Sequence, residues 1–170
     1  MLLPNQEKYL LTIPEDKIAR ILPYDSKSEA VAEEIISRIK SVDSSLTVWY
    51  LGASALKISG QNDLDIYICS FPDDFHKYLP GLKSIFGEPV KEGKFIEWNF
   101  NKKDFEVELY LTDCSEKSSQ GQKKIFDILS NNKELLQEYE ALKLESNGKP
   151  FRDYQRKKYE FYNRILSGES

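Results

Sequence analysis

Two aspartates that stand two positions apart in an apolar run are the residues of this chain best suited to chemistry. Asp63 and Asp65 fall in the segment 63–69, whose pattern predicts a β-strand. Side chains alternate between the two faces of a strand, so both aspartates point the same way while Leu64 and Ile66 face the core. Adjacent carboxylates repel each other unless something compensates, and a divalent cation is the usual compensation where phosphates are handled. The pair therefore predicts a site for Mg²⁺ or Mn²⁺.

A second predicted strand supplies a candidate third ligand. Residues 105–111 alternate strictly, with Glu106, Glu108 and Tyr110 on the polar face. Both glutamates are candidate metal ligands, and spacing alone does not decide which one completes an acidic triad. Two metal ions about 3.5–4 Å apart on such a triad can activate an attacking hydroxyl and neutralise the leaving oxygen of a phosphoryl displacement. Nucleotidyl transfer needs that arrangement.

A turn of small residues precedes the aspartates. Gly52 and Ser54 are candidate nucleotide contacts, because glycine permits close approach and successive backbone N–H groups form a concavity that binds anions. Lys57 follows in the same loop and is within reach of a triphosphate. Its alternative role is that of an ordinary surface lysine. This turn therefore predicts a phosphate-binding element beside the metal site.

Taken together, the Gly52 turn, the spacer, the Asp-x-Asp strand and the later strand acid resemble the DNA polymerase β-type nucleotidyltransferase superfamily. Within it, the chain resembles the GrpB family over nearly its full length. The residues that carry this second resemblance are Ile21-Leu22-Pro23-Tyr24, the segment 133–143, and Tyr154 with Lys158 and Phe161. The chain departs from the usual GrpB pattern in three places: Ala53 stands where serine is usual, Asp63 is an added acid, and Glu108-x-Tyr110 replaces a frequent His-x-His.

The resemblance implies a fold and an activity. The expected fold class is α/β (α+β), a nucleotidyltransferase-like mixed sheet flanked by helices, with a helical extension that closes the nucleotide cleft. The expected reaction transfers a nucleoside monophosphate from a nucleoside triphosphate, ATP or CTP, to an acceptor hydroxyl. Asp63 and Asp65 would hold both metal ions, and likeness to the family strand favours Glu108 over Glu106 as the third catalytic acid.

The acceptor stays open at this point. Tyr154, Lys158 and neighbouring basic and aromatic residues near the C-terminus fit contacts to a nucleotide or to an RNA end such as a tRNA terminus. The alternative for this segment is an amphipathic helix with solvated cations. A protein side chain or a small metabolite fits the acidic overall charge. A non-catalytic nucleotide-sensing or protein-interaction module on the same scaffold is the alternative function.

Composition narrows the class of protein further. The 170 residues carry a net charge of −4, which argues against nonspecific coating of nucleic acid. The single histidine excludes a histidine-cluster metal site. We expect one domain, with residues 1–115 as the α/β catalytic core and 116–170 as the helical extension, and a cytoplasmic protein with no membrane span or signal peptide. Cys69 and Cys114 form no metal-ligand spacing, and we expect free thiols.

The elements that must position these residues follow from periodicity and turn signals. We expect strands at 47–51 and 63–69 and a hairpin of 94–100 with 105–111. A polar loop is expected at 116–121. Helices are predicted at 16–21, 28–42, 75–86, 122–130, 133–145 and 151–166.

Overall fold

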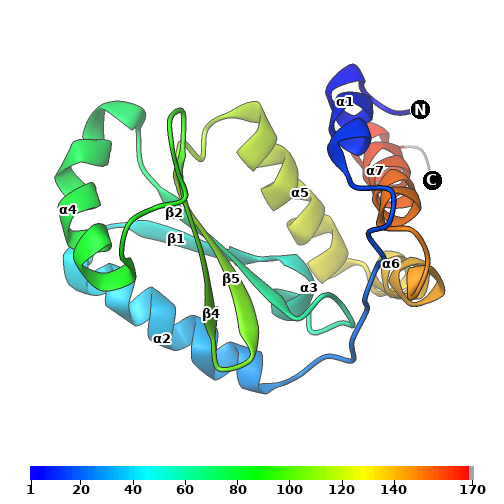
Figure 1. The fold of residues 1–170 in the computed structure, drawn as a ribbon, viewed down its shortest axis with the longest axis horizontal. Coiled ribbons are helices and arrows are strands. Elements are labelled where there is room, and N and C mark those ends of the chain that lie inside the picture. The colour runs from blue at the N-terminus through cyan, green and yellow to red at the C-terminus, as the bar shows by residue number, and fades with distance from the viewer. Residues whose placement is uncertain (169–170) are drawn as a thin grey trace.

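A mixed five-stranded sheet lies at the centre of the computed structural model, which describes residues 1–168 (Figure 1). Its strand order is β1-β2-β5-β4-β3. The β2 and β5 strands run parallel, and every other neighbouring pair is antiparallel. The predicted α/β (α+β) fold class is therefore confirmed. The strands are β1 (Thr47–Leu51), β2 (Asp63–Cys69), β3 (Lys91–Glu92), β4 (Ile96–Lys102) and β5 (Phe105–Thr112).

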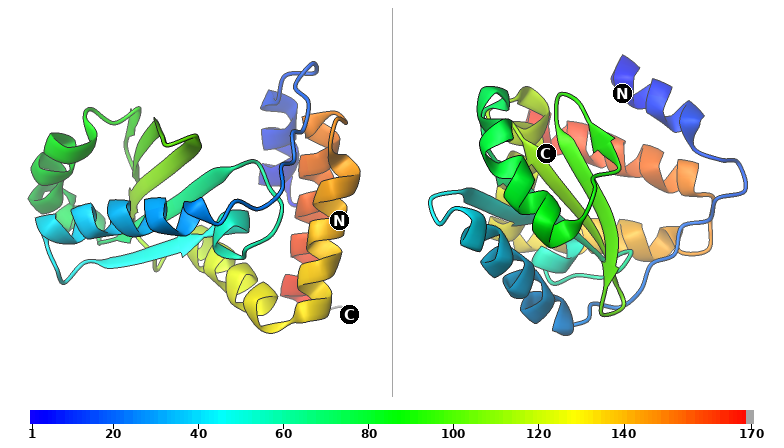
Figure 2. Two further views of the ribbon diagram at one scale, coloured as in Figure 1. Left: turned by 90° about the horizontal axis from the view of Figure 1, so that it is seen from below. Right: turned by 60° about the vertical axis from the view of Figure 1, so that its left-hand side comes forward.

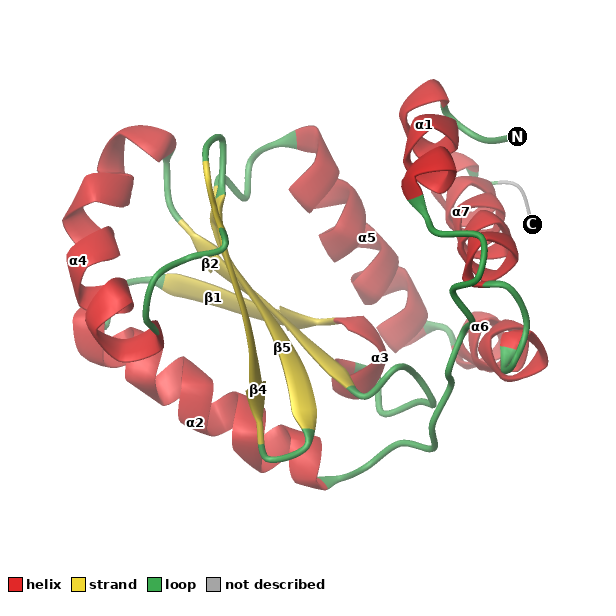
Figure 3. Cartoon of the chain, in the orientation of Figure 1, coloured by secondary structure: helices red, strands yellow, loops and turns green. Residues whose placement is uncertain are grey.

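Residues 1–168 also form seven α-helices, of which α2, α4 and α5 lie along the sheet and α1, α6 and α7 lie beyond one end of it (Figure 3). They are α1 (Pro4–Thr12), α2 (Lys27–Val42), α3 (Gly52–Ala55), α4 (Phe75–Phe86), α5 (Lys117–Asn131), α6 (Lys133–Ser146) and α7 (Phe151–Ser167).

The main hydrophobic core lies between one face of the sheet and the helices α2 and α4. On β2 the side chains of Leu64, Ile66 and Ile68 are fully buried there, while the alternate side chains of the strand face the other way. The β5 strand follows the same alternation, with Val107 and Leu109 fully buried in the same core. Burial of these apolar side chains fixes the register, because a slip by one residue would turn every core side chain toward solvent. The opposite face is thereby left free for the acidic residues.

Two boundaries differ from the prediction in this half of the chain. The hairpin turn is tighter than expected: β4 and β5 are joined by Lys103 and Asp104, which both have positive φ values of 47° and 69°. This backbone matches the right-handed twist of the flanking strands.

The segment 116–121, expected as a polar loop, belongs almost entirely to α5, which begins at Lys117. Ser119 is buried and faces the rest of the protein. Serine and lysine are common on helix surfaces, so polarity alone misled the prediction.

The segment 17–22, called the strap below, is extended rather than helical, so the predicted helix at 16–21 is wrong. Ile18 forms an antiparallel bridge to Pro150, and Leu22 forms one to Gly60. Along the strap, Ala19 and Ile21 are buried while the alternate residues are exposed. That period of two is a strand pattern. It is too short to be distinguished from a helix by sequence alone.

A disulfide joins Cys69 and Cys114, so the expectation of free thiols is also corrected. Cys69 is the last residue of β2, and Cys114 follows β5 by two residues. Because β2 and β5 are parallel neighbours, both strands end at the same edge of the sheet, and the two Cα atoms are 5.2 Å apart. The spacing of the two cysteines alone did not show that these strand ends are neighbours.

The helices α1, α6 and α7 lie together at one end of the molecule, beside α3 and the start of β2 (Figure 2). Two smaller hydrophobic clusters hold them there. One joins α5, α6 and α7 to α3 through residues that include Ile125, Tyr139 and Phe161, and the other joins α1 and the strap to α7. In residues 1–168, none of the helices has the length and apolar composition that crossing a bilayer requires.

Candidate active site

The turn after β1 brings the backbone against an aspartate. Gly52 has a φ of 85°, and Leu51 is paired with Asp65 in the β1–β2 register. A Cβ built on Gly52 would collide with Asp65 Oδ2. The left-handed backbone favours glycine here, and an added Cβ would also force the Asp65 side chain to rotate away.

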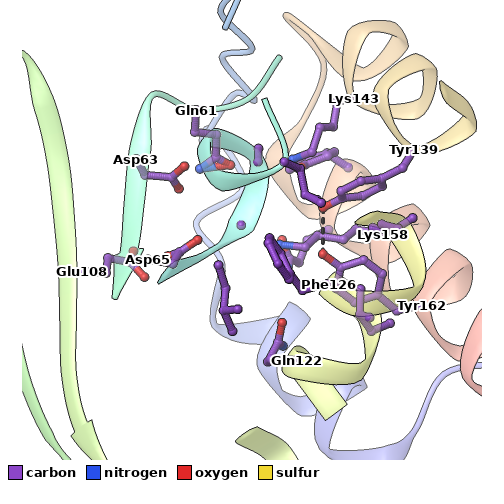
Figure 4. A pocket seen from close by; sticks show the side chains of 18 of the residues that line it. Gln61, Asp63, Asp65, Glu108, Gln122, Phe126, Tyr139, Lys143, Lys158 and Tyr162 are labelled. Carbon is purple, nitrogen blue, oxygen red and sulfur yellow. Dashed lines mark hydrogen bonds between the residues drawn. The ribbon is translucent and has the colours of Figure 1, made fainter. Parts of the chain in front are cut away.

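The parallel β2–β5 pair brings the predicted acids together. Asp65 pairs with Glu108 and Asp63 pairs with Glu106. Asp63, Asp65 and Glu108 line one cavity of about 200 Å³, whereas Glu106 is exposed and lines a separate groove. Of the two glutamates, Glu108 is therefore the one that lies in the cavity with the aspartates (Figure 4).

Two of the three carboxylates, those of Asp65 and Glu108, have raised pKa values. Burial raises the pKa of Asp65 well above its usual value, and the nearby charges of Asp63 and Glu108 raise it further. Burial also raises the pKa of Glu108, although a hydrogen bond from the Tyr110 hydroxyl to Glu108 Oε2, 2.8 Å long, partly offsets this. Within residues 1–168 no side chain forms a hydrogen bond or an ion pair with the carboxylate of Asp63 or Asp65. A divalent cation bound between these carboxylates would offset their repulsion.

The donor set fits a hard divalent cation, which prefers carboxylate oxygens. In the present rotamers, no group of three or more His, Cys, Asp or Glu side chains in the described part of the chain is arranged to hold a metal ion. The backbone register nevertheless places Asp65 and Glu108 directly side by side on one face. Chelation would therefore require side-chain rotation rather than any movement of the strands.

Two lysines from the helical end face the acids across the cavity (Figure 4). Lys143 of α6 is 4% exposed, and its ammonium donates a hydrogen bond of 2.8 Å to the Tyr154 hydroxyl. Burial, and then the positive charge of Lys158, lower the pKa of Lys143 to about 7. Burial acts against a charge on Lys158 of α7 as well, but Tyr162, Tyr154 and the two aspartates outweigh it and raise its pKa. The cavity thus has an acidic wall on the sheet and a basic wall on the helices.

Aromatic residues frame the basic wall. The hydroxyls of Tyr139 and Tyr162 are 2.8 Å apart and hydrogen bonded, and Tyr139 is fully enclosed. Tyr154 is also buried, and Phe126 of α5 lines the same cavity. Of these rings, Phe126 and Tyr162 are only partly buried, and a flat aromatic surface of this kind is one on which a nucleobase can stack.

The predicted site residues fall into two groups. Gly52, Tyr154 and Lys158 line the cavity with the acids. Ser54 and Lys57 do not line it.

Ser54 is buried, and its hydroxyl donates a hydrogen bond of 2.7 Å to the Asp63 backbone carbonyl. Lys57 forms a 2.7 Å ion pair with Glu29 at the surface. In this structure Ser54 therefore fixes the turn to β2, and Lys57 is a surface lysine, which was the alternative that the sequence left open.

Sequence reasoning did not select Lys143, Tyr139 or Gln61 as cavity residues. Tyr139 and Lys143 stand four positions apart and share one helix face, which is a detectable signal. It was not decisive, because α6 carries other charged residues at similar spacing and only the fold shows which face meets the cavity.

A comparison of the chain with models of protein families, and with curated proteins, finds no match.

Proposed function

We propose that this protein is a metal-dependent nucleotidyltransferase that transfers a nucleoside monophosphate from a nucleoside triphosphate to an acceptor hydroxyl. The single observation that carries the proposal is the cavity in which Asp63, Asp65 and Glu108 face Lys143 and Lys158. The phosphates of a nucleoside triphosphate are negatively charged and complement the two lysines. The divalent cation bound to those phosphates is positively charged and complements the carboxylates. The GrpB resemblance supports the same assignment and is itself part of the proposal.

In the proposed reaction, the acceptor oxygen attacks the α-phosphorus, and the bond from that phosphorus to the bridging oxygen of the β-phosphate breaks. Pyrophosphate leaves, and the hydroxyl proton passes to the solvent. Mg²⁺ held by Asp63, Asp65 and Glu108 would lower the pKa of the acceptor hydroxyl and neutralise the leaving oxygen. Lys143 and Lys158 would bind the β- and γ-phosphates and stabilise the charge that develops on pyrophosphate. The Gly52 turn would allow the triphosphate to approach the backbone closely.

Nucleotide binding should depend on pH through Lys143. Its pKa is lowered to about 7, so the free protein loses this positive charge as the pH rises above that value. A bound polyphosphate favours the protonated lysine and raises its pKa in the complex. Affinity for the nucleotide should therefore fall as the pH rises from about 7 toward the higher pKa of the complex.

The decisive experiment incubates the protein with each α-labelled nucleoside triphosphate, Mg²⁺ or Mn²⁺, and fractions of RNA and small molecules. Wild type should release pyrophosphate and transfer label, and Asp65→Asn should abolish both. The matched control is Asp73→Asn, because Asp73 is an exposed carboxylate that does not line the cavity. If a nucleotide binds but no pyrophosphate is released with any acceptor, the protein is a non-catalytic nucleotide-sensing module instead.

A second measurement tests the basic wall. Lys158→Met should weaken nucleotide binding strongly, whereas Lys157→Met, one position along α7 and exposed, should not. Isothermal titration with a non-hydrolysable triphosphate and Mg²⁺ distinguishes the two. Equal affinities for the two variants would refute the role of Lys158.

The proposal includes a cytoplasmic location. The Cys69–Cys114 disulfide bears on it, because disulfides are rare in reducing compartments. Thiol alkylation at the moment of lysis, read on the isolated protein, tests the location: a Cys69–Cys114 bond that is fully formed in the cell would contradict the cytoplasmic location.

A further inference from the structure

A second hollow opens next to the acidic cavity, between the strap and the β4–β5 hairpin. It is a groove of about 410 Å³, called the strap groove below, and it is lined by residues that include Lys17, Arg20, Asp104 and Glu106. Gln61 and Phe151 line both the groove and the acidic cavity. The two hollows therefore adjoin, and a molecule in the groove could reach the metal-binding carboxylates.

The sheet register gives the groove a defined position relative to the acids. Glu106 is the β5 partner of Asp63. It lies on the same face of the sheet as Glu108, which follows it by two positions along β5. The acidic face of the sheet thus continues from the cavity into the groove. A hydroxyl presented from the groove would approach the carboxylates from the Asp63 side.

The strap forms a rigid wall for this groove. Its backbone is hydrogen bonded on both sides, with Leu22 N–H donating to Gly60 O at 2.7 Å and Phe151 N–H donating to Lys17 O at 2.7 Å. Its alternating pattern turns Ala19 into the core and leaves Arg20 exposed toward the groove. A wall that is already ordered costs little further conformational entropy when a ligand binds.

The charges of the groove are balanced and separated. The strap wall carries two cations, Lys17 and Arg20, and the opposite wall carries two carboxylates, Asp104 and Glu106. Within residues 1–168, the side chains of Arg20, Asp104 and Glu106 form no ion pair or hydrogen bond. Lys17 rests its ammonium over the Phe151 ring, 4.1 Å from the centroid. These charged groups are available to a ligand that offers an anion to one wall and a cation to the other.

A nucleic-acid strand does not fit this pattern. Affinity for a phosphate backbone depends on a surplus of positive charge, and the groove has none. The chain as a whole has a net charge of −4. The volume of about 410 Å³ lies within the range of about 300–1,000 Å³ that is typical of small-molecule sites.

We propose that the strap groove binds the acceptor, and that the acceptor is a small zwitterion bearing a free hydroxyl, with its acid group on Lys17 and Arg20 and its amine on Asp104 and Glu106. This inference rests on the proposed function. The hydroxyl oxygen forms the new bond to the α-phosphorus, the bond from that phosphorus to the bridging oxygen breaks, pyrophosphate leaves, and the hydroxyl proton is released to water. The product is a phosphodiester between the zwitterion and the nucleoside.

The test uses the full chain with α-labelled nucleoside triphosphate and Mg²⁺. The acceptors are total RNA and the small-molecule filtrate of a cell extract, separated by ion exchange into zwitterionic, cationic, and anionic or neutral pools. We expect label to appear in the zwitterionic pool. Label found instead on RNA, on protein or in the other small-molecule pools overturns the inference.

Variants of the groove separate this inference from the proposed function. Arg20→Glu and Glu106→Lys should each lower transfer to the zwitterionic pool by roughly tenfold, because a contacting charge then repels the acceptor. Water can replace the acceptor slowly, which gives the nucleoside monophosphate and pyrophosphate. Neither Arg20 nor Glu106 lines the acidic cavity, so this release should continue in both variants, whereas Asp65→Asn should abolish it. The matched control Lys8→Glu changes an exposed lysine of α1 outside the groove and should leave both reactions unchanged.

The outcomes are distinguishable. If water-dependent release persists while Arg20→Glu transfers label as well as wild type does, the groove is not the acceptor site and the proposed function stands. If no pyrophosphate is released under any condition, the proposed function and the acceptor site fall together.

Discussion

Neutralising the most buried site carboxylate should stabilise the metal-free protein. Asp65 and Glu108 are direct partners in the β2–β5 register, and Asp63 adds a third carboxylate on the same face. Neighbouring strands are about 4.8 Å apart. Two charges about 5 Å apart repel by about 3 kcal/mol at an effective dielectric constant near 20. Allowing for screening by solvent, Asp65→Asn should raise the free energy of unfolding by about 1–3 kcal/mol.

The sign of the pH dependence follows from the direction of the pKa shift. Folding raises the pKa of Asp65, so the folded protein holds this proton more tightly than the unfolded chain does. Stability should therefore fall as the pH rises from the unfolded pKa through the folded one. Asp65→Asn removes that group, so the stability of the variant should decline less over the same range, and the gain over wild type should be largest at neutral pH.

Thermal unfolding followed by circular dichroism, in EDTA and between acidic and neutral pH, measures both effects. For a domain of this size the expected gain corresponds to a Tm increase of roughly 3–10 °C at neutral pH. Added Mg²⁺ should then stabilise wild type more than the variant, by about 2.7 kcal/mol if its concentration is 100 times the Kd of wild type. The control Glu106→Gln alters an exposed carboxylate of the same face and should change stability by less than about 0.5 kcal/mol. A Tm for Asp65→Asn below that of wild type in EDTA would refute the reasoning.

Three further predictions follow from the fold and the cavity. Gly52→Ala should lower the free energy of unfolding by about 3 kcal/mol. The control Gly87→Ala has a similar φ of 82° but no atom within 4 Å of the added Cβ, and it should cost about 1 kcal/mol. Equal losses of Tm in the two variants would contradict the steric argument. Cys69→Ser should lower stability by about 2–4 kcal/mol under oxidising conditions, since the disulfide closes a sequence separation of 45 residues, and an unchanged Tm would show that the bond does not form in solution. Lys143→Met should flatten the pH dependence of nucleotide affinity above neutrality, as measured by titration at several pH values, and a wild-type slope in this variant would exclude Lys143 as the titrating group.

The sequence predicted those parts of the fold that rest on long, regular patterns. The strands at 47–51 and 63–69 and the helix at 75–86 have the predicted bounds. Residues 63–69 alternate without interruption, 47–51 is a short apolar run that ends at the Gly52 turn, and Gly87 ends the helix. The strap was missed because six residues with two buried side chains fit either period. Its extended form depends on hydrogen bonds to Gly60 and to residues near Pro150, which are distant in sequence.

Only the acidic wall of the candidate site was predictable from the sequence. The clustering of Asp63, Asp65 and Glu108 was predicted from two facts together. Alternation places the acids on one face of each strand, and the family likeness implies that the two strands are neighbours. The opposite wall depends on how α6 and α7 pack against the sheet, and no local pattern fixes that packing. Lys158 was selected because it lies one helical turn from Tyr154 in a basic and aromatic segment, whereas the fold was needed to show that Lys143 faces the cavity.

The strap has a consequence for how the chain acquires its structure during synthesis. Ile18 and Leu22 emerge from the ribosome early, yet Ile18 bridges Pro150, and Phe151 donates its backbone N–H to Lys17. The strap therefore stays partly unpaired until the residues at the start of α7 have been translated. Contacts between such distant segments form late, so the sheet with its acids can assemble first, and the basic wall and the strap close over it last. A nascent chain stalled before α7 should thus expose the carboxylates without Lys158, one of the two lysines that face them.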